Sequence, residues 1–357
     1  MKLMAQINRL LPYLKKPSDI NTFNNVLVVS NSGLGDTILS TPSIVSLRKS
    51  FPDINITFML NKKMFPLFDG FEFVDSFVLY SSGFFSQLRI IKKLRKRRID
   101  TIFLFHANGP EDVFFSILSG AKNILKTTNN TSHEFQHIFS NPPNSKLQHN
   151  IESKLDLARL FHAKIIVKEM FLNRAFYGQG GMIVNKKSNC RYIGIQLGAQ
   201  DKYKMWPVEN FAQLSKKILD KYKNIFFVLI GATDYEQELS NNYLRLISNF
   251  PDKVFDFTKK TKINELPFLI NDLDLLITND TGVLHLAITL KRKTISLFGP
   301  TDSEEFGPYQ DLDLHKVIQV DGSFVNNVPK KKRSQKGIKL ISVNCVYKVA
   351  DSVLKSL

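Results

Sequence analysis

The 357-residue sequence is poor in cysteine and tryptophan and has no long apolar run. Its two cysteines, Cys190 and Cys345, cannot form a disulfide framework or a four-cysteine metal site, and this favours a reducing compartment. No apolar run approaches the roughly 18 residues of a membrane span. Residues 1–16 do not fit a signal peptide, because Asn8 and Arg9 interrupt the apolar stretch that such a peptide needs.

Acidic side chains are scarce relative to basic ones: 32 Asp and Glu against 49 Lys and Arg leave a net charge of +17. Most of this excess lies in three segments without an acid, Lys2–Lys16, Arg89–Arg98 and Lys330–Lys336. Basic surfaces attract polyanions, namely nucleic acid, anionic membranes or phosphorylated glycolipids. The first segment fits either an interfacial helix or a helix packed on the protein body. The second predicts a helix with a solvated basic face, and the third a basic surface loop.

Apolar residues are plentiful, and strand patterns alternate with helix patterns. Hydrophobic residues make up 43% of the chain, as in soluble globular proteins, and the length suggests two domains. The alternation starts at residue 25, breaks at about residues 163–189 and then restarts, which predicts parallel sheets covered on both faces. The expected order is a basic amphipathic extension (residues 1–24), two doubly wound α/β domains (25–170 and 171–340) and a C-terminal helix (341–357).

The individual elements follow from the same patterns. Strands are expected at 26–29, 54–59, 77–79, 101–105, 192–197, 225–230, 273–277 and 294–297, and helices at 207–221, 264–269, 282–290 and 343–357. Ligands of such sheets bind beyond the carboxyl ends of the strands. Two facing sheets therefore predict a site in the cleft between the domains.

The first candidate motif, Ser30–Asp36, directly follows a predicted strand. Gly33 and Gly35 permit tight backbone turns. A dinucleotide fingerprint would need a third glycine where Ile38 stands, and no Gly-Lys-Ser/Thr of a phosphate loop follows. Asp36 then has two interpretations, a cap of the next helix or a general base.

The second motif, Gln196–Pro207, ends another strand in small residues, including Gly198, and then brings Lys204 to a helix start at Pro207. A lysine beside a helix N-terminus is a plausible phosphate site. The single tryptophan, Trp206, is consistent with ordinary packing.

The third motif, Thr278–Ala287, follows an apolar strand and opens a helix. Asp280 or Thr281 can cap that helix, Gly282 lets a ligand approach, and the helix start offers N–H groups to an anion. His285 lies on the first turn and is either structural or in contact with the same ligand. Another loop on this edge contains Gly299.

Metal-ligand patterns are not found. Asp272 and Asp274 resemble a metal-binding pair of acids but stand at the wrong end of a strand, and no Cys/His cluster has zinc spacing. We therefore expect no metal and no cofactor.

The three motifs, in this order and spacing, resemble those of glycosyltransferase family 9, the lipopolysaccharide heptosyltransferases. The matching stretches are Gly35-Asp36 with Thr41-Pro42, Lys204-Met205-Trp206-Pro207, Asp280-Thr281-Gly282-Val283-Leu284-His285 and Phe298-Gly299-Pro300-Thr301. The resemblance implies a GT-B fold of two Rossmann-like domains that face an interdomain cleft, with the acceptor bound by the first domain and the donor mostly by the second.

The resemblance also implies an activity: inverting transfer of heptose from ADP-L-glycero-D-manno-heptose to the Kdo- or heptose-containing inner core of lipopolysaccharide, without a metal. Asp36 would be the base, and Lys204 with the segment Asp280–His285 would hold the donor diphosphate. In the family a ribose-binding glutamate stands four residues after the glycine that ends a strand. Here Tyr235 holds that place after Gly231, so the next residue, Glu236, is the expected ribose contact.

The partners implied are an ADP-sugar donor, a lipopolysaccharide core or Kdo-lipid A acceptor, and the inner membrane, at whose inner face the enzyme would be cytoplasmic and peripheral. No nucleic acid is implied. The alternatives are a family 9 transferase of another sugar, a GT-B-like sugar-nucleotide epimerase, and a basic nucleic-acid-binding protein, for which the sequence contains neither an aromatic-plus-basic RNA motif nor a zinc finger.

Overall fold

The structure is a computed structural model that describes residues 23–81, 83–106, 110–127, 139, 148–183, 186–320 and 335–357. The predicted N-terminal extension up to residue 22 and the basic loop up to residue 334 lie outside the described residues. Within the part that is described, no helix combines the length and apolarity needed to cross a membrane. The chain divides between Phe171 and Leu172 into two compact units, the N-terminal unit and the C-terminal unit.

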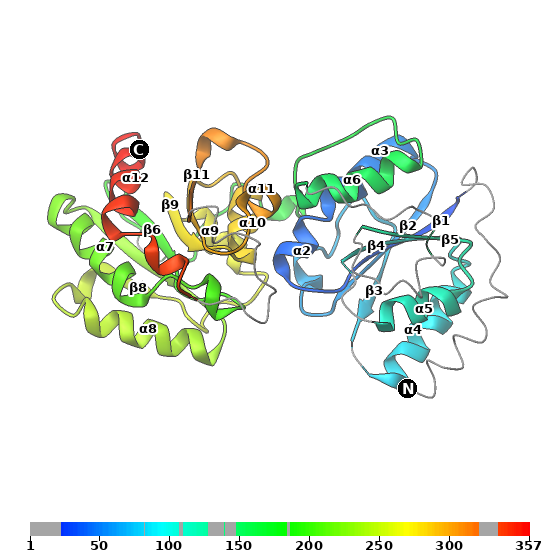
Figure 1. The fold of residues 1–357 in the computed structure, drawn as a ribbon, viewed down its shortest axis with the longest axis horizontal. Helices are drawn as coiled ribbons and strands as arrows, with labels where there is room; N and C mark the ends of the chain where they lie inside the picture. The colour runs from blue at the N-terminus through cyan, green and yellow to red at the C-terminus, as the bar shows by residue number, and fades with distance from the viewer. Residues whose placement is uncertain are drawn as a thin grey trace. The chain divides into compact units, whose positions relative to one another are not determined.

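The N-terminal unit contains a parallel sheet in the order β3-β2-β1-β4-β5. Its strands are β1 (Asn25–Ser30), β2 (Asn55–Asn61), β3 (Ser76–Tyr80), β4 (Thr101–His106) and β5 (Asn123–Lys126). Its helices are α2 (Leu34–Ile38), α3 (Thr41–Ser50), α4 (Phe84–Lys96), α5 (Pro110–Ser119) and α6 (Asn150–Leu160). Figure 1 shows α3 packed with α6 on one face of this sheet and α4 with α5 on the other. Because both faces are covered, the run Val26–Val29 is completely buried.

The C-terminal unit contains a second parallel sheet, in the order β11-β10-β9-β6-β7-β8. Its strands are β6 (Arg191–Gln196), β7 (Ile225–Ile230), β8 (Val254–Asp256), β9 (Leu275–Asn279), β10 (Thr294–Phe298) and β11 (His315–Gln319). Its helices are α7 (Val208–Lys221), α8 (Asp234–Leu246), α9 (Leu266–Asn271), α10 (Gly282–Thr289), α11 (Ser303–Phe306) and α12 (Val343–Lys355), with a 3₁₀ turn η5 (Lys202–Lys204).

Both sheets have the doubly wound topology, which confirms the predicted fold class. In each, the chain starts in the middle, builds outward to one edge and then returns to build the other half. The strand order therefore reverses between β1 and β4 in the N-terminal unit and between β6 and β9 in the C-terminal unit. In such sheets the carboxyl ends of the two strands at the reversal are the usual ligand-binding position.

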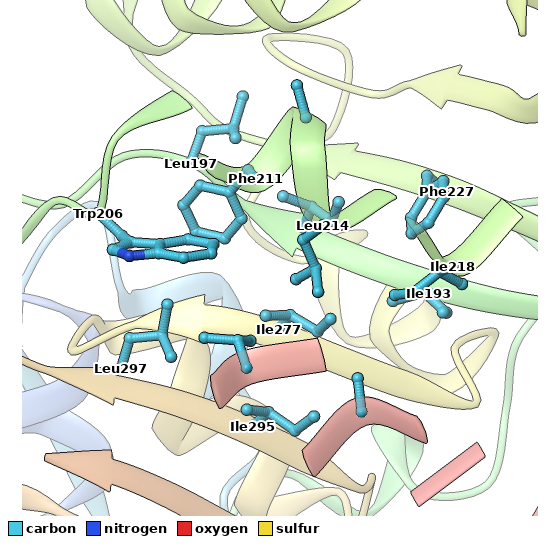
Figure 2. Close-up of a cluster of buried hydrophobic side chains, with 14 of the residues drawn as sticks. Ile193, Leu197, Trp206, Phe211, Leu214, Ile218, Phe227, Ile277, Ile295 and Leu297 are labelled. Atoms are coloured by element: carbon cyan, nitrogen blue, oxygen red, sulfur yellow. The ribbon is translucent and has the colours of Figure 1, made fainter. Parts of the chain in front are cut away.

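A hydrophobic cluster of the C-terminal unit joins α7 and α12 to its sheet (Figure 2). Trp206 is 1% exposed and meets the ring of Phe211 edge-on at 4.8 Å between centroids. Its indole Nε1–H donates to the carbonyl of Ile341 at 2.8 Å, just before α12 begins. The packing interpretation of Trp206 is confirmed, and the C-terminal helix is part of this core.

Asp272 and Asp274 both bind backbone N–H groups. Asp272 accepts from the amides of Gly181, Met182 and Ile183 at 2.7–3.0 Å, and Asp274 accepts from the amide of Tyr192 at 2.8 Å. Asp272 thereby ties the segment that enters the C-terminal unit to the end of α9. Among the described residues, no cluster of three His, Cys, Asp or Glu side chains could hold a metal ion.

We expect Asp272→Asn to lower the free energy of unfolding by about 2 kcal/mol, because an amide accepts through one oxygen only and turns its NH₂ group toward backbone donors. Urea unfolding followed by circular dichroism measures the change. Asp252→Asn is the matched control, since Asp252 is exposed. Equal stability of the two variants would contradict this anchoring role.

Candidate active site

The C-terminal unit places the second and third motifs at its strand-order reversal, where β6 and β9 end. The buried side chain of Asn279, the last residue of β9, connects them. Its Nδ2 donates to the carbonyl of Leu197 at 3.0 Å, with the carbonyls of Gln196 and Gly198 at 3.3 and 3.4 Å. Its Oδ1 accepts from the amide of Trp206 at 2.9 Å. The motif alone does not predict this role, although an asparagine that ends an otherwise apolar buried strand is a usable signal.

Lys204 and Asp280 form an ion pair with 2.6 Å between Nζ and Oδ2. The lysine side chain is 19% exposed and the aspartate 6%. A carboxylate repels a diphosphate, so Asp280 is suited to orienting the ammonium group rather than to touching an anion. An ammonium has three N–H donors, and the pair with Asp280 uses one of them at this distance. Lys204 therefore combines a fixed position with capacity to bind phosphate.

The start of α10 lies beside this ion pair in the sequence. Thr281 is the N-cap, with extended backbone (φ −141°, ψ 167°), and its side chain makes no capping hydrogen bond. Its hydroxyl lies 3.3 Å from that of Thr278. Gly282 opens the helix, so backbone N–H groups and the positive end of the helix dipole face the end of β9. His285, one turn in, is 4% exposed, and its carbonyl accepts from Thr289 at 2.7 Å.

Glu236 lies next to Gly198 at the end of β6. Its Oε1 accepts from Nε2 of Gln196 at 2.6 Å, and its Oε2 accepts from the amides of Ala232 and Thr233 at 2.9 Å. With Thr233 it forms the capping box that starts α8, a helix absent from the sequence predictions although Thr-x-x-Glu is its usual signal. Most of the carboxylate's hydrogen-bonding capacity is thus used within the protein, and the remainder is on Oε1.

Two glycines permit this packing. A Cβ atom on Gly198 would lie 2.5 Å from Cγ of Glu236, so only glycine lets that carboxylate reach the end of β6. A Cβ atom on Gly299 would lie 3.2 Å from the carbonyl oxygen of Tyr203 and 3.1 Å from Cβ of Ile338. Gly299 therefore lets the loop after β10 approach η5, the turn that holds Lys204.

The N-terminal unit places the first motif at its own strand-order reversal, after β1. Asp36 is the third residue of α2, and Gly33 is the N-cap, so the interpretation of Asp36 as an N-cap is wrong. The Oδ2 atom of Asp36 accepts from the hydroxyl of Ser32 at 2.7 Å, and its backbone carbonyl accepts from the hydroxyl of Ser40 at 2.7 Å. The carboxylate is half-buried, so its position is fixed while part of it stays accessible.

The expected need for glycine freedom in this loop is not found. Gly33 has φ −81° and ψ −178°, extended backbone that any residue adopts, and Gly35 lies inside α2 without a positive φ. A Cβ atom on Gly33 would meet nothing within 4 Å.

Lys154, on α6, is a buried cation close enough to Asp36 to interact with its charge. Burial lowers the pKa of Lys154 to about 8, and the negative charge of Asp36 opposes part of that shift. The ammonium group donates to the side-chain oxygen of Asn150. The sequence patterns do not predict a role for Lys154, which lies in α6, a helix that they also do not predict.

Two doubly wound sheets in one chain define the class: this is a GT-B protein, like the solved structures that it resembles. It superposes on a glycosyltransferase family 9 protein of Veillonella parvula with a TM-score of 0.75 (19% identity, covering 96% of this chain and 100% of the other). For the ADP-heptose lipopolysaccharide heptosyltransferase II of E. coli the TM-score is 0.74 (17% identity, covering 93% and 99%).

The family follows from the sequence. The profile of glycosyltransferase family 9 (heptosyltransferase) matches residues 144–335, more than half of the chain, so the chain belongs to this family and is a glycosyltransferase. Lipooligosaccharide heptosyltransferase 2 of Campylobacter jejuni is 27% identical over 292 residues, covering 81% of this chain and 84% of that protein. Lipopolysaccharide heptosyltransferase 1 of Campylobacter coli is 24% identical, covering 84% and 91%. The resemblance found in the motifs is confirmed.

We expect Gly198→Ala to destabilise the C-terminal unit by about 1–3 kcal/mol, because the new methyl group must displace the Glu236 side chain. Gly33→Ala is the matched control and should change the free energy of unfolding by less than about 0.5 kcal/mol, since the site is open. Urea unfolding of both variants measures the contrast. A destabilised Gly33→Ala with an unchanged Gly198→Ala would reverse this account.

Lys154 predicts a pH dependence of stability. Between its folded pKa of about 8 and the ordinary value of 10.5, the folded protein has released this proton while the unfolded chain still holds it. The unfolding free energy therefore rises with pH there, by up to about 1.4 kcal/mol per pH unit from this group. Urea unfolding at the two ends of this range should show the rise in the wild type relative to Lys154→Met. Parallel pH profiles of the two proteins would disprove it.

Proposed function

We propose that this protein transfers heptose from ADP-L-glycero-D-manno-heptose to the Kdo- or heptose-containing inner core of lipopolysaccharide, with inversion at the sugar carbon. The observation that carries the proposal is the Lys204–Asp280 pair at the start of α10, at the strand-order reversal of the C-terminal unit. This arrangement suits a diphosphate, and the similar proteins are named heptosyltransferases. A similar E. coli heptosyltransferase, WaaC, has been solved with ADP.

The donor would be held by charge and by backbone N–H groups. Lys204 binds the diphosphate through its ammonium group, and Thr281 and Gly282 present the start of α10 to it. Asp280 keeps Lys204 in place, and His285 supports the first turn from inside. Glu236 offers Oε1 to a ribose hydroxyl, and Gly198 and Gly299 let these segments come together.

The reaction would be a single displacement. The carboxylate of Asp36 takes the proton from an acceptor hydroxyl, and that oxygen forms a bond to the anomeric carbon of heptose as the bond from that carbon to the phosphate oxygen breaks. ADP leaves with the electron pair. Lys204 and the N–H groups of α10 stabilise the negative charge that develops on it, so we propose that no metal ion or other cofactor is needed.

The substrates suggest where the enzyme works. The donor is a nucleotide sugar and the acceptor is a lipid-linked, acidic saccharide, so we propose a cytoplasmic enzyme that is peripheral at the inner face of the inner membrane. The net charge of +17 suits an acidic acceptor and an anionic surface. Nucleic acid is not a proposed partner.

We expect Asp36→Asn to reduce heptose transfer by about 10²–10⁴-fold, because the amide cannot accept the hydroxyl proton. Its affinity for ADP, measured by calorimetry, should equal that of the wild type, and Lys204→Met should show the opposite pattern of weakened ADP binding. Asp53→Asn, an exposed aspartate of the N-terminal unit, is the control for both.

Two results would count against the proposal. Turnover of Asp36→Asn at the wild-type rate would remove the assigned base. Stronger stabilisation by UDP than by ADP in a thermal-shift assay with ADP, UDP, GDP and CMP would overturn the donor assignment and favour a transferase of another sugar or an epimerase.

A further inference from the structure

The outer face of α4 combines exposed apolar side chains with unpaired cations. Phe85 is 75% exposed and Leu88 44%. The same helix carries exposed cations toward its C-terminal end, namely Arg89, Lys92, Lys93 and Lys96. Large exposed apolar side chains that gather in one place indicate an interaction surface.

Helix geometry places these residues on one surface. At about 100° per residue, Phe85, Arg89, Lys92 and Lys96 fall within about 60° of one another around the helix axis. The opposite side of α4 is anchored in the unit: Ile90, Ile91 and Leu94 are buried in a cluster with β1 and α5. The remaining residues therefore lie together on the outward side of the helix. We define this outer face as Phe85, Leu88, Arg89, Lys92, Lys93 and Lys96.

The charge of the outer face is uncompensated. Residues 84–98 include no acid, and within the described part of the chain Arg89, Lys92, Lys93 and Lys96 form no ion pair or side-chain hydrogen bond. Two other cations of the segment differ: Arg95 donates to the carbonyl of Leu118 at 2.8 Å, and Arg97 is oriented toward the carbonyl of Phe77 at 3.4 Å. The structure thus separates cations that support the fold from those that face outward.

This pattern matches the chemistry of a lipid surface. Lysine and arginine bind the phosphates of anionic lipids, and exposed phenylalanine and leucine enter the boundary between head groups and acyl chains. A protein interface would instead be depleted of lysine at its centre. We propose that the outer face of α4 docks on an anionic lipid bilayer, with Phe85 and Leu88 inserted among the head groups.

This docking surface rests on the proposed function, because a transferase with a lipid-linked acceptor meets that acceptor at the membrane. Vesicle binding, however, needs neither donor nor acceptor. A failure of vesicle binding and a failure of heptose transfer are therefore separate results.

The test is co-sedimentation of the full-length protein with vesicles of phosphatidylglycerol in phosphatidylcholine, and with vesicles of phosphatidylcholine alone. The wild type should bind the anionic vesicles only, and less at high salt. Lys92→Gln with Lys96→Gln should weaken binding by about 25-fold, from about fivefold per cation. Phe85→Ser with Leu88→Ser should weaken it by about tenfold or more.

Matched controls come from the C-terminal unit. Leu312→Ser removes another large exposed apolar side chain (63% exposed), and Lys339→Gln with Lys348→Gln removes two exposed cations. Both should bind like the wild type, and all variants should transfer heptose to a delipidated, water-soluble acceptor at the wild-type rate. Equal binding to both kinds of vesicle, wild-type binding by both α4 variants, or equal losses in the controls would overturn the proposal.

Discussion

The candidate donor site depends on the buried amide of Asn279. It holds the carbonyls at the end of β6 on one side and the amide of Trp206 on the other, so the strand, the turn that carries Lys204 and the start of α7 share one reference point. The indole of Trp206 then links this point to the segment before α12. A buried amide left without these partners would cost more than its bonds contribute, which keeps the loops in register.

Each unit places a cation and an acid together where its strand order reverses. In the C-terminal unit Lys204 pairs with Asp280, and in the N-terminal unit the buried Lys154 interacts with the charge of Asp36. The ion pair with Asp280 makes the partly buried charge of Lys204 tolerable, and the ammonium group is the more exposed partner, which suits an anion. In the N-terminal unit Lys154 is buried and its ammonium group donates to Asn150, while Asp36 is the more exposed of the two, which suits a hydroxyl proton.

Basic residues serve different purposes within a few positions of one another. Arg95 and Arg97 are directed to backbone carbonyls, while Arg89 and Lys92 face outward beside exposed apolar side chains. A net charge of +17 is therefore not a uniform property of the surface. Some cations bond to backbone carbonyls within the protein, and only the others are available to a ligand or surface. On α4 these other cations lie together with Phe85.

The sequence by itself determined the doubly wound class, most strands to within about two residues, and the three motifs that belong to the family, because apolar periodicity and glycine-bounded turns are local signals. It did not reveal α5, α6 or α8, or the roles of Asn279 and Lys154. It also could not tell that Gly33, and not Asp36, is the N-cap of α2. Only the tertiary structure decided these, because a hydrogen bond across about 80 positions, as from Asn279 to Leu197, exists only once the strands are paired.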